Sequence, residues 1–284
     1  MITIMRGSPV AAAMKEKMLK EVDELDQMGI IPRLAIVRIG VRPDDLAYER
    51  NAVKKLEGIG VRCKVFEYPE EITQLEFEEE FAQVNSNPEI HGILLFRPLP
   101  KHLNEDSIKN SINPLKDVDC LSFVNMAKVF SGDESGFAPC TAEAVIEVLD
   151  YYGIEVQGKR VTIVGRSMVV GKPLSMLLLK KNATITICHT KTIDLENTCK
   201  NAEILIAAAG KANMITAGFI DENSAVIDVG INVDATGNLC GDVDFESVSP
   251  VAGFITPVPG GVGTVTSSVL AKHVIRAAKQ INNK

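Results

Sequence analysis

The chain has 284 residues, 46% of them hydrophobic and 24% charged, a globular composition that excludes wholesale disorder. This length allows two domains or one large domain. The formal net charge of −7 argues against a nucleic-acid-binding surface, because binding to phosphate backbones needs clustered Lys and Arg. With no Trp and only 5% aromatic residues, the core must be aliphatic, which favours buried parallel strands covered by helices.

Cysteine and histidine give no pattern of a metal site or a disulfide framework. The six cysteines are scattered without a C-x-x-C pair, and the four histidines are isolated. We therefore expect reduced thiols, no bound metal and a cytoplasmic location. No apolar run approaches the roughly 20 residues that span a bilayer, and the first residues lack a secretion signal, so no membrane contact is expected.

The first half of the chain alternates helix and strand patterns. Helices are expected at residues 9–29, 45–58 and 75–85, and strands at residues 34–37, 61–66 and 92–96. This rhythm predicts a mostly parallel sheet. From Asp117 to Thr141 the periodicity fades and Gly132, Gly136 and Pro139 occur, so we expect a linker or domain cleft there.

The second half begins a new α/β series after a helix expected at residues 141–152. Strands are expected at residues 159–165, 183–188, 204–208 and 225–229, and helices at residues 173–179 and 266–280. The predicted class is therefore α/β, with parallel sheets in both halves of the chain.

A strand-turn-helix segment from Val164 to Pro173 is typical of dinucleotide binding. It is not the complete G-x-G-x-x-G fingerprint, because Ser167 stands where the middle glycine would be. Gly165 permits a tight turn, Ser167 can donate to a phosphate oxygen, and Gly171 permits close packing of the helix on the sheet. The alternative is a structural strand-to-helix turn that binds no ligand.

The end of the next strand favours NADP over NAD. Residues 189–192 (His-Thr-Lys-Thr) contain no Asp or Glu to bind a ribose hydroxyl, whereas Lys191 and Arg166 would attract a 2′-phosphate. For Lys191 the alternative is a solvated loop lysine. Small residues also follow two later strands, at 207–210 and 228–232, where ligands of open α/β sheets bind, although tight packing explains each segment alone equally well.

Together with Lys116–Asp119, Gly241–Asp244 and Pro257–Gly263, these segments resemble the bifunctional methylenetetrahydrofolate dehydrogenase/cyclohydrolase family along nearly the whole chain. The resemblance implies two α/β domains, the second Rossmann-like, with a folate cleft between them, a folate substrate and a homodimer. It implies a folate and catalytic domain at 1–139, an NADP-binding domain at 140–265, and a last helix, 266–284, that packs back on the first domain. The residues implied to hold NADP are Gly165, Arg166, Ser167, Thr190 and Ile231.

The same resemblance implies a folate site. Tyr48 matches the tyrosine that stacks on and orients the pterin, and Asp119 matches the carboxylate that hydrogen-bonds the pterin ring, so these two are the candidate catalytic residues. Phe96 and Gly261 complete the implied substrate-binding set. The alternatives are a helix-surface tyrosine for Tyr48 and a loop N-cap for Asp119.

The chain departs from the family at several positions of this site. The family has a lysine four residues after the tyrosine, and here that position is Ala52. The family's glutamine is replaced by Phe96, followed by Arg97, and the serine three residues before the tyrosine is replaced by Asp45. Losing the lysine and the glutamine together predicts a repacked apolar site, because a single loss would leave an unpaired buried polar group. Two further departures replace family prolines: Ala142 and Thr264.

These departures separate two reactions. Hydride transfer moves no proton, whereas hydrolysis of the methenyl group needs a positioned acid/base. We therefore expect NADP-dependent oxidation of methylenetetrahydrofolate to methenyltetrahydrofolate in one-carbon metabolism, with cyclohydrolase activity weakened or lost. Arg97 would be a poor general base, since arginine stays protonated.

Three alternatives stay open. The first is a fully bifunctional enzyme that makes formyltetrahydrofolate with Lys55 or a repositioned group as its acid/base. The second is a non-catalytic folate- or dinucleotide-binding protein, which the altered cleft would suit. The third is a different Rossmann dehydrogenase, for which Tyr48 and residues 117–119 would match the family by coincidence.

Overall fold

The computed structural model describes residues 2–234 and 236–282, and all structural statements below refer to them. The chain divides into two compact units. The six-stranded unit comprises Met1–Ala12 and Thr141–Thr266, and the three-stranded unit comprises Ala13–Cys140 and Ser267–Lys284. Within the described residues, no helix is both long enough and apolar enough to cross a bilayer.

The three-stranded unit is built on a parallel sheet in the order β3-β2-β4. Its strands are β2 (Arg33–Ile39), β3 (Arg62–Tyr68) and β4 (Gly92–Leu95). Four helices lie wholly within the unit: α2 (Pro43–Glu57), α3 (Gln74–Ser86), α4 (Glu105–Ser111) and α5 (Phe123–Ser131). Most of α1 (Gly7–Gln27) and most of α10 (Val262–Asn282) also belong to it.

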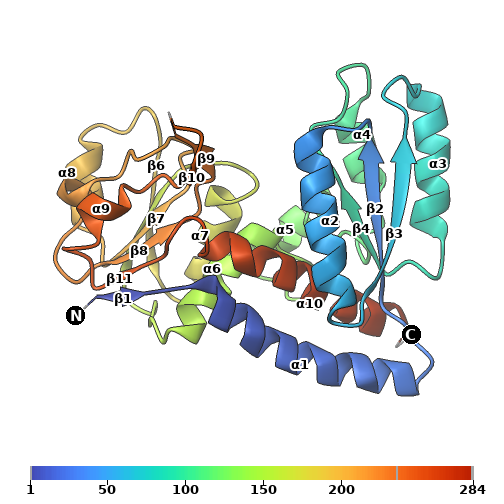
Figure 1. The fold of residues 1–284 in the computed structure, drawn as a ribbon, viewed down its shortest axis with the longest axis horizontal. Coiled ribbons are helices and arrows are strands. Elements are labelled where there is room, and N and C mark those ends of the chain that lie inside the picture. Colours follow the sequence, from blue (N-terminus) through green and yellow to red (C-terminus); the bar gives the residue numbers. More distant parts are fainter. Residues whose placement is uncertain (1, 235, 283–284) are drawn as a thin grey trace. The chain divides into compact units, whose positions relative to one another are not determined.

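Aliphatic strand residues and helix phenylalanines form the core of this unit. On one sheet face, Ala35 and Val37 of β2 join a buried cluster with Phe77 and Phe81 of α3. Figure 1 shows α3 running beside the β2-β3-β4 sheet. A Cβ on Gly92 of β4 would lie 2.9 Å from side-chain atoms of both Val118 and Val274, so only glycine fits there. The predicted parallel strands are confirmed, and the core is largely aliphatic as expected but includes the buried Phe77 and Phe81.

The stretch expected to be a linker or domain cleft, Asp117 to Thr141, contains helix α5, and the boundary between the two units falls at its end, after Cys140. Ser122 caps α5 through its side chain, which accepts a hydrogen bond from the backbone N–H of Asn125. Asp117, Ser122 and Asn125 are all buried and bonded to one another. Buried polar residues hid the helical pattern, because periodicity arguments expect apolar residues at buried positions.

The six-stranded unit contains a parallel sheet in the order β1-β11-β8-β7-β5-β6. Its strands are β1 (Thr3–Ile4), β5 (Arg160–Val164), β6 (Thr184–Cys188), β7 (Ile204–Ala207), β8 (Ala225–Asp228) and β11 (Phe254–Ile255). A short antiparallel pair consists of β9 (Asn232–Val233) and β10 (Leu239–Cys240). The helices are α6 (Cys140–Tyr151), α7 (Gly171–Lys180), α8 (Leu195–Lys200), the 3₁₀ turn η1 (Ala217–Phe219) and α9 (Phe245–Val248).

The strand order places a topological switch point between β5 and β7. From β5 the chain adds β6 on one side, and from β7 it adds β8 and then β11 on the other side. In such doubly wound sheets, ligands bind outside the carboxyl ends of the two strands at the switch point. The predicted α/β class is confirmed, and the switch point indicates where a ligand of this unit binds.

The amino-terminal residues depart from the expected domain limits. Residues 1–139 were expected to form the first domain. Strand β1, however, pairs with β11 in parallel register, with Thr3 opposite Phe254. Residues 1–12 therefore lie in the six-stranded unit. Residues 267–282 of α10 lie in the three-stranded unit, and the contact boundary between the units follows Cys140.

Candidate active site

Backbone contacts at the end of β5 require the glycines of the predicted dinucleotide turn. Gly165 has a φ of +136°, and a Cβ there would lie 2.0 Å from the carbonyl oxygen of Ala208, the first residue after β7. A Cβ on Gly171 would lie 2.1 Å from the carbonyl oxygen of Gly165. The turn therefore joins the ends of the two switch-point strands by contacts that any larger side chain would break.

The start of α7 provides donors for an anion. No side chain caps its first turn, and Ser167 accepts a hydrogen bond from the backbone N–H of Val170 at 3.1 Å, so its own hydroxyl hydrogen stays available. The Lys172 backbone N–H is already bonded to the Ser167 carbonyl oxygen at 3.0 Å, so the helix dipole and the Ser167 hydroxyl are what favour a negative group here. Arg166, also in the turn, adds a positive charge.

The other predicted cofactor residues follow neighbouring strands. Thr190 and Lys191 are exposed in the turn after β6, which is closed by a 2.8 Å hydrogen bond from the His189 backbone N–H to Thr192 Oγ1. Ile231 follows β8, with 71% of its surface exposed. Because the strands are parallel, these residues lie at the same carboxyl edge as the turn after β5. The glycine cradle and the uncapped helix start fit a dinucleotide.

In the three-stranded unit, Tyr48 of α2 contacts Phe96, which follows β4. The ring centroids are 5.7 Å apart, with the rings tilted by 57°. Phe96 is buried and Tyr48 is 40% exposed, so the tyrosine ring packs against a buried neighbour while its side chain still reaches solvent. Desolvation and the nearby Asp119 carboxylate raise the pKa of Tyr48, so its phenol stays protonated near neutral pH. It is therefore a hydrogen-bond donor and not a base.

Asp119 is held at the start of α6. Its Oδ1 accepts a hydrogen bond from the backbone N–H of Cys140 at 2.8 Å. Burial raises the pKa of Asp119, and the hydrogen bonds from Cys140 act in the opposite direction. The sequence did not single out Cys140 as a site residue, although the Pro139-Cys140-Thr141 segment was the available signal.

A polar network joins the start of α2 to the loop after β4. Arg42 donates through Nε to Asp45 at 2.7 Å and through Nη2 to the carbonyl oxygen of Arg97 at 3.0 Å. Arg97 in turn donates through Nε to Glu105 at 2.6 Å. Two positions where the chain departs from the family, Asp45 and Arg97, thus belong to one network. Because β2 lies between β3 and β4, this network spans the switch point of the second sheet.

Ala52 lies one helical turn beyond Tyr48 on α2 and is fully buried. The helix carrying both residues is anchored to β2, where the buried Arg38 donates through Nε to Glu49 at 2.9 Å. The position of the family's lysine is therefore occupied by a buried methyl group, which can neither accept nor donate a proton.

Gly261, the remaining predicted substrate residue, lies in the other unit, where a Cβ would come within 2.4 Å of the Pro257 carbonyl oxygen. The predicted site residues thus form two groups, each placed within its own unit. Tyr48, Phe96 and Asp119 belong to the three-stranded unit, and Gly261 and the five cofactor residues belong to the six-stranded unit.

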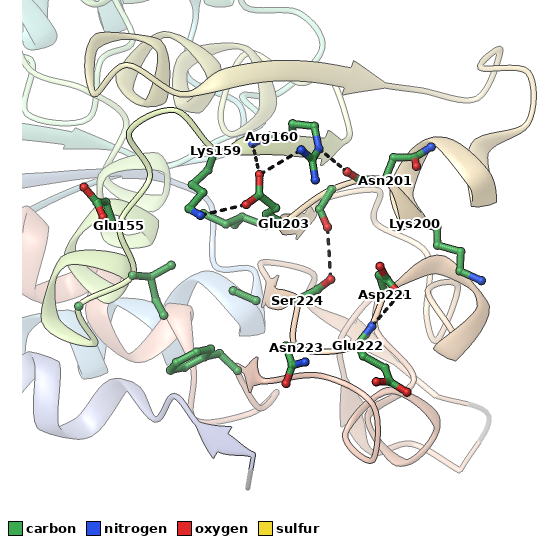
Figure 2. A pocket seen from close by; sticks show the side chains of 16 residues that line it. Glu155, Lys159, Arg160, Lys200, Asn201, Glu203, Asp221, Glu222, Asn223 and Ser224 are labelled. Atoms are coloured by element: carbon green, nitrogen blue, oxygen red, sulfur yellow. Dashed lines mark hydrogen bonds and ion pairs between the residues drawn. The ribbon is translucent and has the colours of Figure 1, made fainter.

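A cavity of about 520 Å³ in the six-stranded unit lies at the opposite, amino edge of the sheet. Figure 2 shows Lys159 and Arg160 directed at Glu203, with Lys159 Nζ 3.0 Å from its carboxylate. These lysine and arginine charges are paired, and ligands of parallel sheets bind at the carboxyl edge. This cavity therefore lacks the features expected of the cofactor site.

Comparisons with known proteins assign both parts of the chain to one family. Residues 5–119 match the family model "Tetrahydrofolate dehydrogenase/cyclohydrolase, catalytic domain", and residues 139–282 match the model of the same family's NAD(P)-binding domain. The chain is 54% identical over 281 residues to "Bifunctional protein FolD" of Clostridioides difficile, covering 99% of this chain and 98% of that protein.

Two solved structures extend the similarity to three dimensions. The bifunctional FolD enzyme of Campylobacter jejuni superposes with a TM-score of 0.96 at 38% identity, covering 99% of each chain. The Trypanosoma brucei methylenetetrahydrofolate dehydrogenase-cyclohydrolase, complexed with NADP and an inhibitor, gives 0.91 at 34% identity, covering 98% of each chain. The chain therefore belongs to the tetrahydrofolate dehydrogenase/cyclohydrolase family, with a catalytic domain and an NAD(P)-binding domain.

Proposed function

We propose that this chain is an NADP-dependent methylenetetrahydrofolate dehydrogenase in which the cyclohydrolase step is weak or absent. The dehydrogenase part is supported by the family and by its relatives, which are named for both activities or solved with NADP. The loss of hydrolysis rests on one observation above all: the buried Ala52, one turn from the Tyr48–Phe96 contact, where the family has a lysine.

Oxidation makes modest demands on the protein. Bound NADP supplies the hydride acceptor. Tyr48 presents a ring face and a neutral phenol to the pterin, and Asp119 accepts hydrogen bonds from the pterin's amino donors. The turn with Gly165 and Ser167 holds the phosphates, and Arg166 and Lys191 favour NADP over NAD through attraction of the 2′-phosphate. No proton transfer is required, so the main task of the protein is to orient the pterin and nicotinamide rings toward each other.

Hydrolysis needs a group that accepts and returns a proton near neutral pH, and general acid–base help is typically worth about 10²–10⁴-fold. Tyr48 does not suit the base role, because its pKa is raised. Arg97 does not suit it either, since it is paired with Glu105 and arginine stays protonated. Near Tyr48, Ala52 contributes only an apolar methyl group.

The alternative, a fully bifunctional enzyme, would use Lys55 as the acid/base for hydrolysis. It lies seven residues after Tyr48, on the same face of α2, and desolvation lowers its pKa although its side chain still reaches solvent. Its Cα, however, lies about 4.5 Å further along the helix than that of Ala52, so its amine must reach back to serve the same site.

The two versions are separated by three variants assayed for hydrolysis of methenyltetrahydrofolate and for NADP reduction. With the pair Ala52→Lys and Phe96→Gln combined, we expect hydrolysis to rise at least about tenfold above wild type, within the range of acid–base catalysis. Lys55→Ala and its matched control Lys54→Ala, which lies on the face of α2 opposite Ala52, should both leave hydrolysis at the wild-type level. Selective loss of hydrolysis in Lys55→Ala would overturn the proposal in favour of the bifunctional enzyme.

The cytoplasmic location and the homodimer are further proposals. Reduced scattered cysteines support the first, and the family resemblance supports the second. Light scattering during size-exclusion chromatography tests the dimer, and a monomer mass at assay concentrations would refute it.

A further inference from the structure

Two buried carboxylates at the carboxyl edge of the six-stranded sheet have no role in the reaction described above. Asp228 ends β8 and is 3% exposed, and Asp242 follows β10 and is fully buried. We call these two residues the carboxylate pair. They belong to two sequence motifs, Asp-Val-Gly-Ile-Asn at residues 228–232 and Gly-Asp-Val-Asp at residues 241–244.

Asp242 accepts hydrogen bonds from two different segments of the edge. Its Oδ2 accepts from the backbone N–H groups of Ala209 and Gly210, at 2.6 and 2.9 Å. Its Oδ1 accepts from the Lys211 backbone N–H at 2.8 Å and from Asn232 Nδ2 at 2.9 Å. One side chain therefore ties the loop after β7 to the segment after β8.

Asp228 binds the third segment, residues 241–244, which contains Asp242. Its Oδ1 accepts from the backbone N–H of Gly230 at 2.9 Å and of Asp242 at 3.1 Å, and its Oδ2 accepts from Val243 at 2.9 Å. The carboxylate pair thus connects three backbone segments, and all these donors suit the ionised, acceptor-only form of each carboxylate.

The two motifs are also complementary in shape. A Cβ on Gly230 would lie 2.4 Å from the carboxyl carbon of Asp242, and a Cβ on Gly241 would lie 1.8 Å from Asp228 Oδ2. Each aspartate therefore packs against the bare Cα of a glycine in the other motif. This reciprocal packing explains why each motif contains an Asp and a Gly.

We propose that the carboxylate pair is a positioning device for the dinucleotide, fixing three loops of the cofactor edge in their binding geometry. The inference rests on the proposed function, because the cofactor is taken to be NADP. The loop held by Asp242 begins at Ala208, whose carbonyl oxygen abuts the Cα of Gly165 in the phosphate turn, and the segment after β8 carries Ile231. Both carboxylates are buried and bonded to backbone N–H groups, so we assign them an action through the backbone and no contact with the reacting atoms.

The test compares Asp242→Asn with Asp244→Asn. The first keeps the shape of the side chain but turns one acceptor oxygen into an NH₂ group that faces backbone donors. The second removes a carboxylate two residues away, which caps α9 by accepting from the Ser247 backbone N–H at 3.1 Å. Asn232→Ala, which removes one of the four donors to Asp242, is the milder variant should Asp242→Asn not fold.

Two measurements are made on each protein. Hydrogen exchange without cofactor, followed by mass spectrometry, should show at least about tenfold faster exchange of the peptide over residues 208–212 in Asp242→Asn and a smaller acceleration in Asn232→Ala. Titration of NADPH fluorescence, which no Trp in this chain obscures, should show Kd raised at least about tenfold in Asp242→Asn and about threefold in Asn232→Ala. Asp244→Asn should match wild type in both.

Unchanged exchange of residues 208–212 in the Asp242 and Asn232 variants would overturn the inference, as would faster exchange with an unchanged Kd for NADPH. An equal rise of Kd in Asp244→Asn would also overturn it, since that result indicates general destabilisation. Failure of the wild-type chain to bind NADPH would refute the proposed function and, with it, the role of the pair toward NADP. In that case the exchange experiment still distinguishes the two failures, because it reports on the three loops without cofactor.

Discussion

Asp228 is a buried acid whose titration should be visible in the stability of the protein. Burial raises the pKa of Asp228 to about 6, against the opposing effect of three backbone N–H donors. The unfolded chain releases this proton near the ordinary aspartate pKa of about 3.9, whereas the folded chain holds it to about pH 6. The stabilisation that this group contributes is therefore fully present below about pH 4 and is lost as the pH rises through about 6.

The size of the effect follows from the pKa difference. Each unit corresponds to about 1.36 kcal/mol, so a shift of about two units gives an upper limit of about 3 kcal/mol. In the variant Asp228→Asn this titration is absent, although the amide weakens the fold at every pH by facing backbone donors. The free energy of unfolding of wild type minus that of the variant should fall by about 2 kcal/mol between about pH 4.5 and about pH 7.5.

Urea unfolding followed by circular dichroism at the two pH values measures this difference. Asp244→Asn serves as the control, because it removes a carboxylate from the same segment without breaking a hydrogen bond to Asp228. A difference between wild type and Asp228→Asn that is independent of pH, or that grows as the pH rises, would refute the reasoning that burial dominates at Asp228.

Three further substitutions have defined outcomes. Asp117→Ala removes a buried carboxylate that accepts four hydrogen bonds, so urea unfolding should show a loss of at least about 3 kcal/mol, and a loss below 1 kcal/mol would contradict the network. Gly171→Ala places a Cβ 2.1 Å from the Gly165 carbonyl oxygen, so NADPH titration should show at least about tenfold weaker binding, and wild-type affinity would contradict the close approach. Arg42→Ala breaks the hydrogen bond to the Arg97 carbonyl and should raise KM for methylenetetrahydrofolate about threefold to tenfold while leaving the Kd of NADPH unchanged. Equal changes in both constants would indicate a general loss of structure.

Local patterns in the sequence were enough to predict the main parallel strands and the dinucleotide turn. The turn at Gly165 combines an apolar strand, a glycine and a following helix within a short segment, and each of these signals is local. Strand β1 could not be predicted in the same way, because Thr3 and Ile4 are too short a run to show alternation. Its partner Phe254 lies about 250 residues further along the chain, and only tertiary structure brings them together.

The candidate site shows the same division between local and tertiary information. Tyr48 and Ala52 could be assigned to one face of a helix from their spacing, and the resemblance supplied their expected neighbours. The bond from Arg42 to the Arg97 carbonyl and the contacts of Asp242 join segments that are far apart in sequence. Sequence periodicity gives no information on such long-range contacts. The sequence therefore showed Asp228 and Asp242 as members of two separate motifs and did not show that they interact.

The central claim is that oxidation is retained while hydrolysis is weak or lost, and one comparison tests it most directly. Purified wild-type protein is assayed in parallel for NADP-dependent oxidation of methylenetetrahydrofolate and for hydrolysis of methenyltetrahydrofolate. With a buried Ala52 in place of an acid/base, we predict oxidation with NADP and hydrolysis at least about 10²-fold slower. Hydrolysis at a rate comparable to oxidation would contradict the account.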